Sequence, residues 1–311
     1  MAWFIVALSA YLILAVVNLI DKFLVSSVLK DSKAYAFVAC ILGSLVFVIA
    51  PWFLHWPGWG LFAFNLLNGL VFALALWSLY EALLRGEAAR TLVFIGGMTP
   101  VFSLLFSILF FKEHFSINEW WGIALILIGI AIIILLPVTH SYLARLMKRL
   151  KLRNDVKKGG LWIALLSALF YSLYFIGTKE AYVSQPFLSA FIWTRLGASF
   201  FVLFFLFSSA TRRAIKRTFH HSSPNKHKFL VFANQFFGAS GFILQNYAIF
   251  LGSVVLVNAL QGAQYAFLLI ISTILAILRP KLLKEKFSWR ILIQKTIAVL
   301  FIIAGIYFIA I

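Results

Sequence analysis

The polar phrase Lys112-Glu113-His114-Phe115-Ser116 recurs about half a chain length later as Lys284-Glu285-Lys286-Phe287-Ser288. Each copy follows an apolar run and precedes a second apolar run that contains a glycine, at Gly129 and Gly305 respectively. A phrase repeated at this interval indicates a duplicated unit. In membrane proteins, duplicated units often build a binding site between two halves. The repeated phrase therefore predicts a fold made of two related halves.

The composition is that of a membrane protein. Hydrophobic residues make up 63% of the chain and charged residues only 12%, and the mean hydropathy is +1.01, whereas soluble domains carry about 25% charged residues. Ten apolar runs reach the roughly 20 residues that a helix needs to cross a bilayer. They cover residues 3–28, 34–54, 59–84, 88–111, 117–137, 159–183, 187–209, 228–250, 253–278 and 287–310. We expect an all-α polytopic membrane protein with ten transmembrane helices, the first being a span and no cleaved signal peptide.

The net charge of +18 is distributed in a way that indicates topology. Apart from Lys112, Lys179 and Arg195, every Lys and Arg lies in an odd-numbered connection between the runs or in the half of a run that adjoins one. Basic connections face the cytoplasm, so both termini are predicted to lie outside the cytoplasmic membrane. The expected partners of the basic loops are anionic lipid headgroups, and no nucleic acid is expected.

The halves meet at a basic segment that has five apolar runs on either side. We expect a first five-helix repeat at 1–137, a linker at 138–158 and a second repeat at 159–311. Because five is odd, the second repeat enters the membrane from the opposite face, which makes the two repeats inverted in topology.

Several motifs resemble those of a known family. They are the turn Ala82-x3-Gly86-Glu87 with its counterpart Ala248-x3-Gly252-Ser253, Pro100 inside the fourth run, and the two Lys-Glu-x-Phe-Ser phrases. With ten helices arranged as five plus five, the whole chain resembles the EamA-type drug/metabolite transporter superfamily. The resemblance implies alternating-access transport or exchange of a small metabolite through a central cavity. It also implies cytoplasmic termini, which is the reverse of the orientation that the charge distribution predicts.

Arg195 is the strongest candidate for a functional residue. It lies about eight residues into the seventh run, or roughly 12 Å at the rise of an α-helix. Ionisable groups at such depth are costly and commonly functional. A guanidinium suits an anion or carboxylate clamp, and a structural ion pair or a snorkelling side chain remains the alternative.

The other substrate-binding candidates are polar or aromatic side chains inside the runs. With Arg195 they form the set Tyr171, Tyr174, Asn246, Asn258, Gln261, Gln264, Tyr265, Asn68 and Trp77. Asn258, Gln261 and Gln264 recur every three residues and therefore share one face of the ninth run. Within lipid such side chains either line a cavity or form hydrogen bonds that bridge helices, and Trp77 either stacks on a ligand or packs.

Five residues are candidates for coupling or gating. Asp21 is a protonatable carboxylate or a local partner of Lys22, and Glu81 lies four residues before Arg85, the spacing of a helical ion pair. Pro100 frees a backbone carbonyl and favours a kink, and Lys179 either gates or forms an interfacial pair.

Enzyme motifs do not fit the sequence. Gly238-Ala239-Ser240-Gly241 matches an intramembrane serine-protease motif, but every histidine falls in a loop or at the edge of a run. We expect no enzyme activity, no cofactor and no metal. The sequence favours a secondary active transporter or exchanger of a small organic metabolite, anionic or zwitterionic. The alternatives are a flippase for a lipid-linked substrate and a non-transporting membrane scaffold subunit, and homodimer formation is left open.

Overall fold

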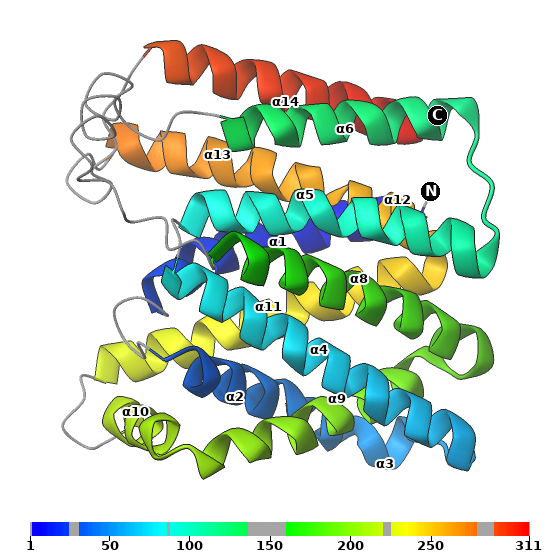
Figure 1. Cartoon of the computed structure of the whole chain (residues 1–311), viewed down its shortest axis with the longest axis vertical. Helices are drawn as coiled ribbons and strands as arrows, with labels where there is room; N and C mark the ends of the chain where they lie inside the picture. Colours follow the sequence, from blue (N-terminus) through cyan, green and yellow to red (C-terminus); the bar gives the residue numbers. More distant parts are fainter. Residues whose placement is uncertain are drawn as a thin grey trace.

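The computed structural model describes residues 2–24, 31–85, 88–135, 160–219, 225–278 and 289–310. Within these ranges all regular secondary structure is helical. Long helices lie side by side, and the two ends of the chain lie toward the same side of the array (Figure 1). The predicted linker at 138–158 and the second copy of the repeated phrase lie outside the described residues.

The first half contains α1 (Ala2–Phe23), α2 (Ser32–Gly43), η2 (Ser44–Ile49), α3 (Ala50–Phe53), α4 (Trp59–Arg85), α5 (Ala88–Phe106), η3 (Ser107–Phe111) and α6 (Ile117–Leu135). The second half contains α8 (Gly160–Ser184), α9 (Phe187–Leu203), η4 (Phe204–Phe207), α10 (Ser209–Phe219), α11 (Asn225–Leu251), α12 (Val254–Ala259), α13 (Gln261–Leu278) and α14 (Trp289–Ala310).

Among the described residues, five helical stretches are long and apolar enough to cross a membrane. They are Ser32–Phe53, Trp59–Arg85, Phe94–Phe111, Gly160–Ser184 and Phe187–Phe207. Shorter apolar stretches lie at Ala2–Asn18, Ile117–Ile132, Val254–Leu268 and Thr296–Ile309. The predicted all-α membrane class is therefore confirmed, and within the described part of the chain five of the ten predicted spans meet the requirement of length and composition.

The first copy of the repeated phrase forms a turn between two helices. Lys112 ends η3 with a left-handed backbone conformation (φ 51°), and the Ser107 hydroxyl donates to the Glu113 carboxylate. Ser116 and Glu119 then cap the start of α6 reciprocally, with N···O distances of 2.7 Å and 3.3 Å. This is a capping box, which satisfies backbone donors that the first helical turn leaves free. The phrase thus has a local structural role.

Close helix contacts depend on glycine. A Cβ on Gly122 of α6 would lie 2.8 Å from the Gly305 carbonyl oxygen of α14, and a Cβ on Gly305 would lie 2.6 Å from the Gly122 oxygen. The two backbones therefore touch. Gly69 of α4 and Gly197 of α9 play the same part at the crossing of their helices. Small residues drive such packing within membranes, where apolar burial gains little.

The remaining long helices pair across the two halves. α4 packs along α8, α1 packs along α11, and α5 contacts both α12 and α13. α10 runs across the direction of the long helices, seen nearly end-on in Figure 1, and contacts α2 and η4. The cavity described below lies among these paired helices.

Candidate functional site

Two adjoining cavities lie between helices of the two halves, with volumes of about 120 Å³ and 90 Å³. Their walls share Leu14, Asn18, Leu79, Tyr171 and Phe242, so the two spaces meet. The larger space is lined by Asp21 and Arg195, and we call it the charged end. The smaller is lined by Gln245, Gln261 and Gln264, and we call it the amide end.

Arg195 lies at the charged end with only 6% of its surface exposed. Its guanidinium carbon is 4.0 Å from the ring centre of Phe72 on α4, 4.7 Å from that of Phe191 on α9 and 4.5 Å from that of Phe242 on α11. Each ring face attracts the cation through its quadrupole. Three helices thus hold the guanidinium in place, and none of these contacts uses its hydrogen-bond donors.

Two of the guanidinium nitrogens have no acceptor. Nε and Nη2 of Arg195 are buried without a hydrogen-bond partner, and no carboxylate among the described residues lies within 4 Å as an ion-pair partner. A buried charge is costly unless it is paired. Nε and Nη2 share one edge of the guanidinium plane, which is the fork that binds a carboxylate with two parallel hydrogen bonds. Arg195 therefore presents an edge that is suited to binding an anion.

Asp21 also lines the charged end, and its exposed fraction is 7%. Its Oδ1 accepts hydrogen bonds from the Tyr35 hydroxyl and from Asn234 Nδ2, the latter at 2.7 Å. Gln235 Nε2 in turn donates to the Tyr35 hydroxyl at 3.1 Å. No Lys or Arg whose side chain is described forms an ion pair with Asp21. The cavity therefore carries one guanidinium and one carboxyl group that form no ion pair with each other.

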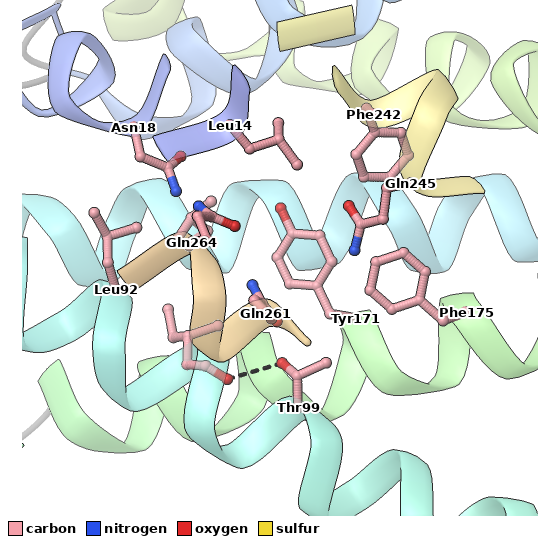
Figure 2. A pocket seen from close by; sticks show the side chains of 12 residues that line it. Leu14, Asn18, Leu92, Thr99, Tyr171, Phe175, Phe242, Gln245, Gln261 and Gln264 are labelled. Atoms are coloured by element: carbon pink, nitrogen blue, oxygen red, sulfur yellow. Dashed lines mark hydrogen bonds between the residues drawn. The ribbon is translucent and has the colours of Figure 1, made fainter. Parts of the chain in front are cut away.

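The amide end takes its polar groups from α1, α5, α8, α11 and α13 (Figure 2). Gln245 Nε2 donates to the Tyr11 hydroxyl at 3.3 Å, whereas Gln261 Oε1 is buried without a partner. The helix break at Leu260, which separates α12 from α13, places Gln261 at the first position of α13. Tyr171 stands between the two ends, because it belongs to both walls.

Other predicted binding residues link helices outside these walls. The Tyr174 hydroxyl donates to Asn246 Oδ1 at 2.9 Å, which joins α8 to α11. Asn258 Nδ2 donates to Ser103 Oγ at 2.8 Å, which joins α12 to α5. Asn68 bonds to Thr178, which joins α4 to α8. These four residues hold together the helices that surround the cavity.

Trp77 lies away from both cavity walls. The Lys33 ammonium is 5.2 Å from the centre of the Trp77 ring, and the Phe205 ring centre is 5.4 Å from it. The side chain of Tyr265 lies outside the described residues. Of the ten predicted binding residues, the structure brings Arg195, Tyr171, Gln261 and Gln264 to the cavity walls.

The coupling and gating candidates lie in separate places. Glu81 accepts from Ser32 and pairs with Arg85 at 2.5 Å, and so ties the start of α2 to the end of α4. The Lys179 ammonium donates to the carbonyls of Ile249, Phe250 and Gly252 at 3.0, 3.3 and 2.8 Å, and so caps the C-terminus of α11. Pro100 lies inside α5, and the side chain of Lys22 lies outside the described residues. Of these candidates, Asp21 alone has a described side chain that lines the cavity.

Sequence reasoning missed the aromatic residues around Arg195 and the bonds around Asp21. Phe72, Phe191 and Phe242 are three of 34 phenylalanines, and no sequence signal distinguishes them. Asn234 and Gln235 carry a usable signal, because two adjacent amides inside an apolar helix are expensive in lipid unless they have partners. Within the described ranges, no three His, Cys, Asp or Glu residues gather as a metal-binding group.

Comparison with known proteins then shows a likeness to one family. Residues 1–135 match the model of the EamA-like transporter family. This match and the apolar helices indicate an integral membrane protein whose first 135 residues are similar to membrane transporters. No curated protein matches the chain.

Solved structures share the fold of this EamA-like chain. One, titled "Crystal structure of protein", aligns over 99% of this chain and 94% of its own, with a TM-score of 0.63 and 14% sequence identity. At that identity the likeness shows the fold alone. The shared fold covers nearly the whole chain, whereas the family model matches residues 1–135.

Proposed function

We propose that this EamA-like chain is a secondary active transporter or exchanger of a small organic solute across the cytoplasmic membrane. Support comes from the likeness of residues 1–135 to a transporter family and from the cavity, whose wall is built from α1, α2, α4 and α5 of the first half and α8, α9, α11 and α13 of the second. A site between two halves suits alternating access, in which one half rocks against the other. The sequence has no ATP-binding motif that would indicate a primary pump.

The proposed architecture is an inverted repeat of 1–137 and 159–311. Exchange of corresponding helices between the halves turns the α4–α8 pair into the α11–α1 pair, and both pairs are present. The same exchange maps the α6–α14 pair and the α2–α9 pair onto themselves. These pairings are the ones that a two-fold axis in the membrane plane would generate. The odd-numbered connections are proposed to face the cytoplasm.

Arg195 is the observation that carries the proposed substrate preference. A guanidinium whose Nε and Nη2 have no protein acceptor, held among aromatic rings at a cavity wall, suits a carboxylate or another oxyanion. An anion in the fork would fill Nε and Nη2 and would neutralise the buried charge. Binding of an anion at Arg195 is therefore proposed to lower the free energy of the folded protein.

Asp21 extends the preference to zwitterions. Its carboxylate lines the same charged end and forms no ion pair with a described Lys or Arg side chain. A substrate ammonium or amine near Asp21 would complement it, while the substrate anion occupies the Arg195 fork. The proposed substrate is therefore anionic or zwitterionic.

The test is a binding and uptake comparison with two Arg195 variants. Arg195→Lys keeps the charge and loses the planar fork, and Arg195→Met keeps much of the volume and loses the charge. We expect carboxylate solutes to stabilise the purified wild-type protein, with weaker stabilisation of Arg195→Lys and none of Arg195→Met. Unchanged uptake of these solutes by normally expressed Arg195→Met would refute the assignment. A scaffold subunit would show no solute-dependent stabilisation at all.

A further inference from the structure

The amide end is chemically different from the charged end, and the two share a wall. A molecule bound at Arg195 can extend toward Gln261 and Gln264 through the space between the shared wall residues Leu14, Leu79, Tyr171 and Phe242. No charged side chain lines the amide end. The part of a substrate that reaches this end is therefore expected to be uncharged.

The amide end is also rich in hydrogen-bonding capacity. Its wall includes Asn18, Thr99, Gln245, Gln261 and Gln264, and each glutamine amide offers two donors and an acceptor. In Figure 2 the one hydrogen bond drawn among the lining residues joins Thr99 to the backbone carbonyl of Ile95, at 2.8 Å. No hydrogen bond joins these glutamine side chains to one another, and Gln245 Nε2 donates to Tyr11, which lies outside the wall. The amide groups of Gln261 and Gln264 can therefore bind a ligand.

Gln261 gives the most specific sign of a missing partner. Its Oε1 is buried without a donor, although the residue lies at a helix break where its position is fixed by the backbone. A buried acceptor left unpaired destabilises the protein, because it has lost its hydrogen bond to water. Asn65 Oδ1 and Gln185 Nε2 also lack partners, but these two amides do bridge helices, since Asn65 Nδ2 donates to Gln185 Oε1 at 2.9 Å. Gln261 instead lines the cavity, and no hydrogen bond joins its side chain to another described residue.

We propose that the amide end is a subsite for an uncharged, hydrogen-bonding part of the substrate, a hydroxyl or a carboxamide group. The acid group of the same molecule occupies the Arg195 fork, so the inference rests on the proposed function. The substrate class is a small hydroxylated or amide-bearing acid or zwitterion. Alkyl acids of the same length should bind with lower affinity, because their tails would leave the polar groups of Gln261 and its neighbours without hydrogen-bond partners.

Two matched pairs of small molecules test the subsite on the purified full-length protein. Gluconate and hexanoate share a carboxylate and six carbons and differ in tail hydroxyls. Glutamine and norleucine share a zwitterionic head and differ in the tail amide. For at least one pair, we expect the polar member to bind the wild-type protein at least tenfold more tightly, as measured by ligand-dependent thermal stabilisation. Gln261→Met should lower that ratio about tenfold without weakening the apolar member.

Gln185→Met is the matched control, because it removes a buried amide that lies outside both walls. It should leave the polar-to-apolar ratio unchanged. The polar-to-apolar affinity ratio of the wild-type protein can be measured without any variant, so the test does not depend on whether Gln261→Met folds. If Gln261→Met misfolds, Gln264→Met replaces it. Equal binding of both members in both pairs, with binding still dependent on Arg195, would overturn the subsite alone. Failure of all four molecules to bind would contradict the proposed function together with the subsite.

Discussion

Substitution of Gly69 by alanine tests the packing that places the site. Gly69 faces α9, and an added Cβ would lie 2.6 Å from the Ala198 nitrogen, 2.9 Å from the Gly197 carbonyl carbon and closer still to the Thr194 oxygen. All three are backbone atoms, which cannot rotate away as a side chain would. α4 and α9 must therefore separate by roughly 1 Å to restore an ordinary contact distance.

The magnitude follows from a matched control on the same helix. Gly60 of α4 has no heavy atom within 4 Å of an added Cβ. Alanine in place of glycine gains up to about 1 kcal/mol of helix propensity at either site, whereas overpacking at Gly69 costs about 1–3 kcal/mol. This gain in helix propensity is common to both variants and therefore largely cancels from the difference in their stabilities. Gly69→Ala should therefore be less stable than Gly60→Ala by roughly the overpacking cost, toward its upper end because backbone meets backbone.

Cys40 provides the assay, because it is the single cysteine of the chain and is buried. Its carbonyl accepts from Ser199 of α9 at 3.3 Å, so its thiol reports on packing beside α9. A thiol-reactive dye in detergent should record an unfolding temperature several degrees lower for Gly69→Ala than for Gly60→Ala. Phe72 lies one helical turn from Gly69, so carboxylate binding at Arg195 should also weaken. An unfolding temperature for Gly69→Ala equal to or above that of Gly60→Ala would refute the reasoning.

Three further predictions concern separate elements. Lys179→Met should lower the unfolding temperature, because the α11 carbonyls lose their donor, while Lys179→Arg should recover part of it; equal temperatures for all three proteins would contradict the cap. Asp21→Asn should weaken binding of glutamine and strengthen binding of glutarate. A change of the two binding affinities in the same direction would argue against a zwitterion site. Neutralising exposed Arg213 and Lys216 of α10 to glutamine should reduce the anionic phospholipids retained in native mass spectrometry, and unchanged retention would exclude α10 as a lipid contact.

The class and the helix positions were accessible from the sequence, because lipid imposes long apolar runs on any spanning helix. The break at Leu260 was not, because α12 and α13 read as one apolar run and the capping Ser253 precedes both. The repeated Lys-Glu-x-Phe-Ser phrase indicated duplication. Its role as a helix stop and a capping box became visible with the backbone of Lys112 and Ser116.

The charged residues of the candidate site could be predicted from the sequence, whereas the residues that surround them could not. Arg195 and Asp21 stand out because charges inside apolar runs are rare. The aromatic rings around Arg195 come from three helices. A single sequence does not show which distant apolar residues contact each other. Tyr174 and Asn246 were chosen as cavity candidates by the same rule that chose Gln261. Whether a polar side chain bridges helices or faces a cavity depends on helix rotation, which one sequence does not specify.

The central claim is that the Arg195 fork binds the anionic group of a transported solute. The most direct measurement is the carboxylate-dependent shift in unfolding temperature for wild-type protein, Arg195→Lys and Arg195→Met, titrated with glutamine, gluconate and glutarate. We predict that at least one of these solutes gives a saturable upward shift for wild-type protein. That shift should need at least tenfold more ligand in Arg195→Lys and be absent in Arg195→Met. A folded Arg195→Met protein that keeps the wild-type shift would contradict the account.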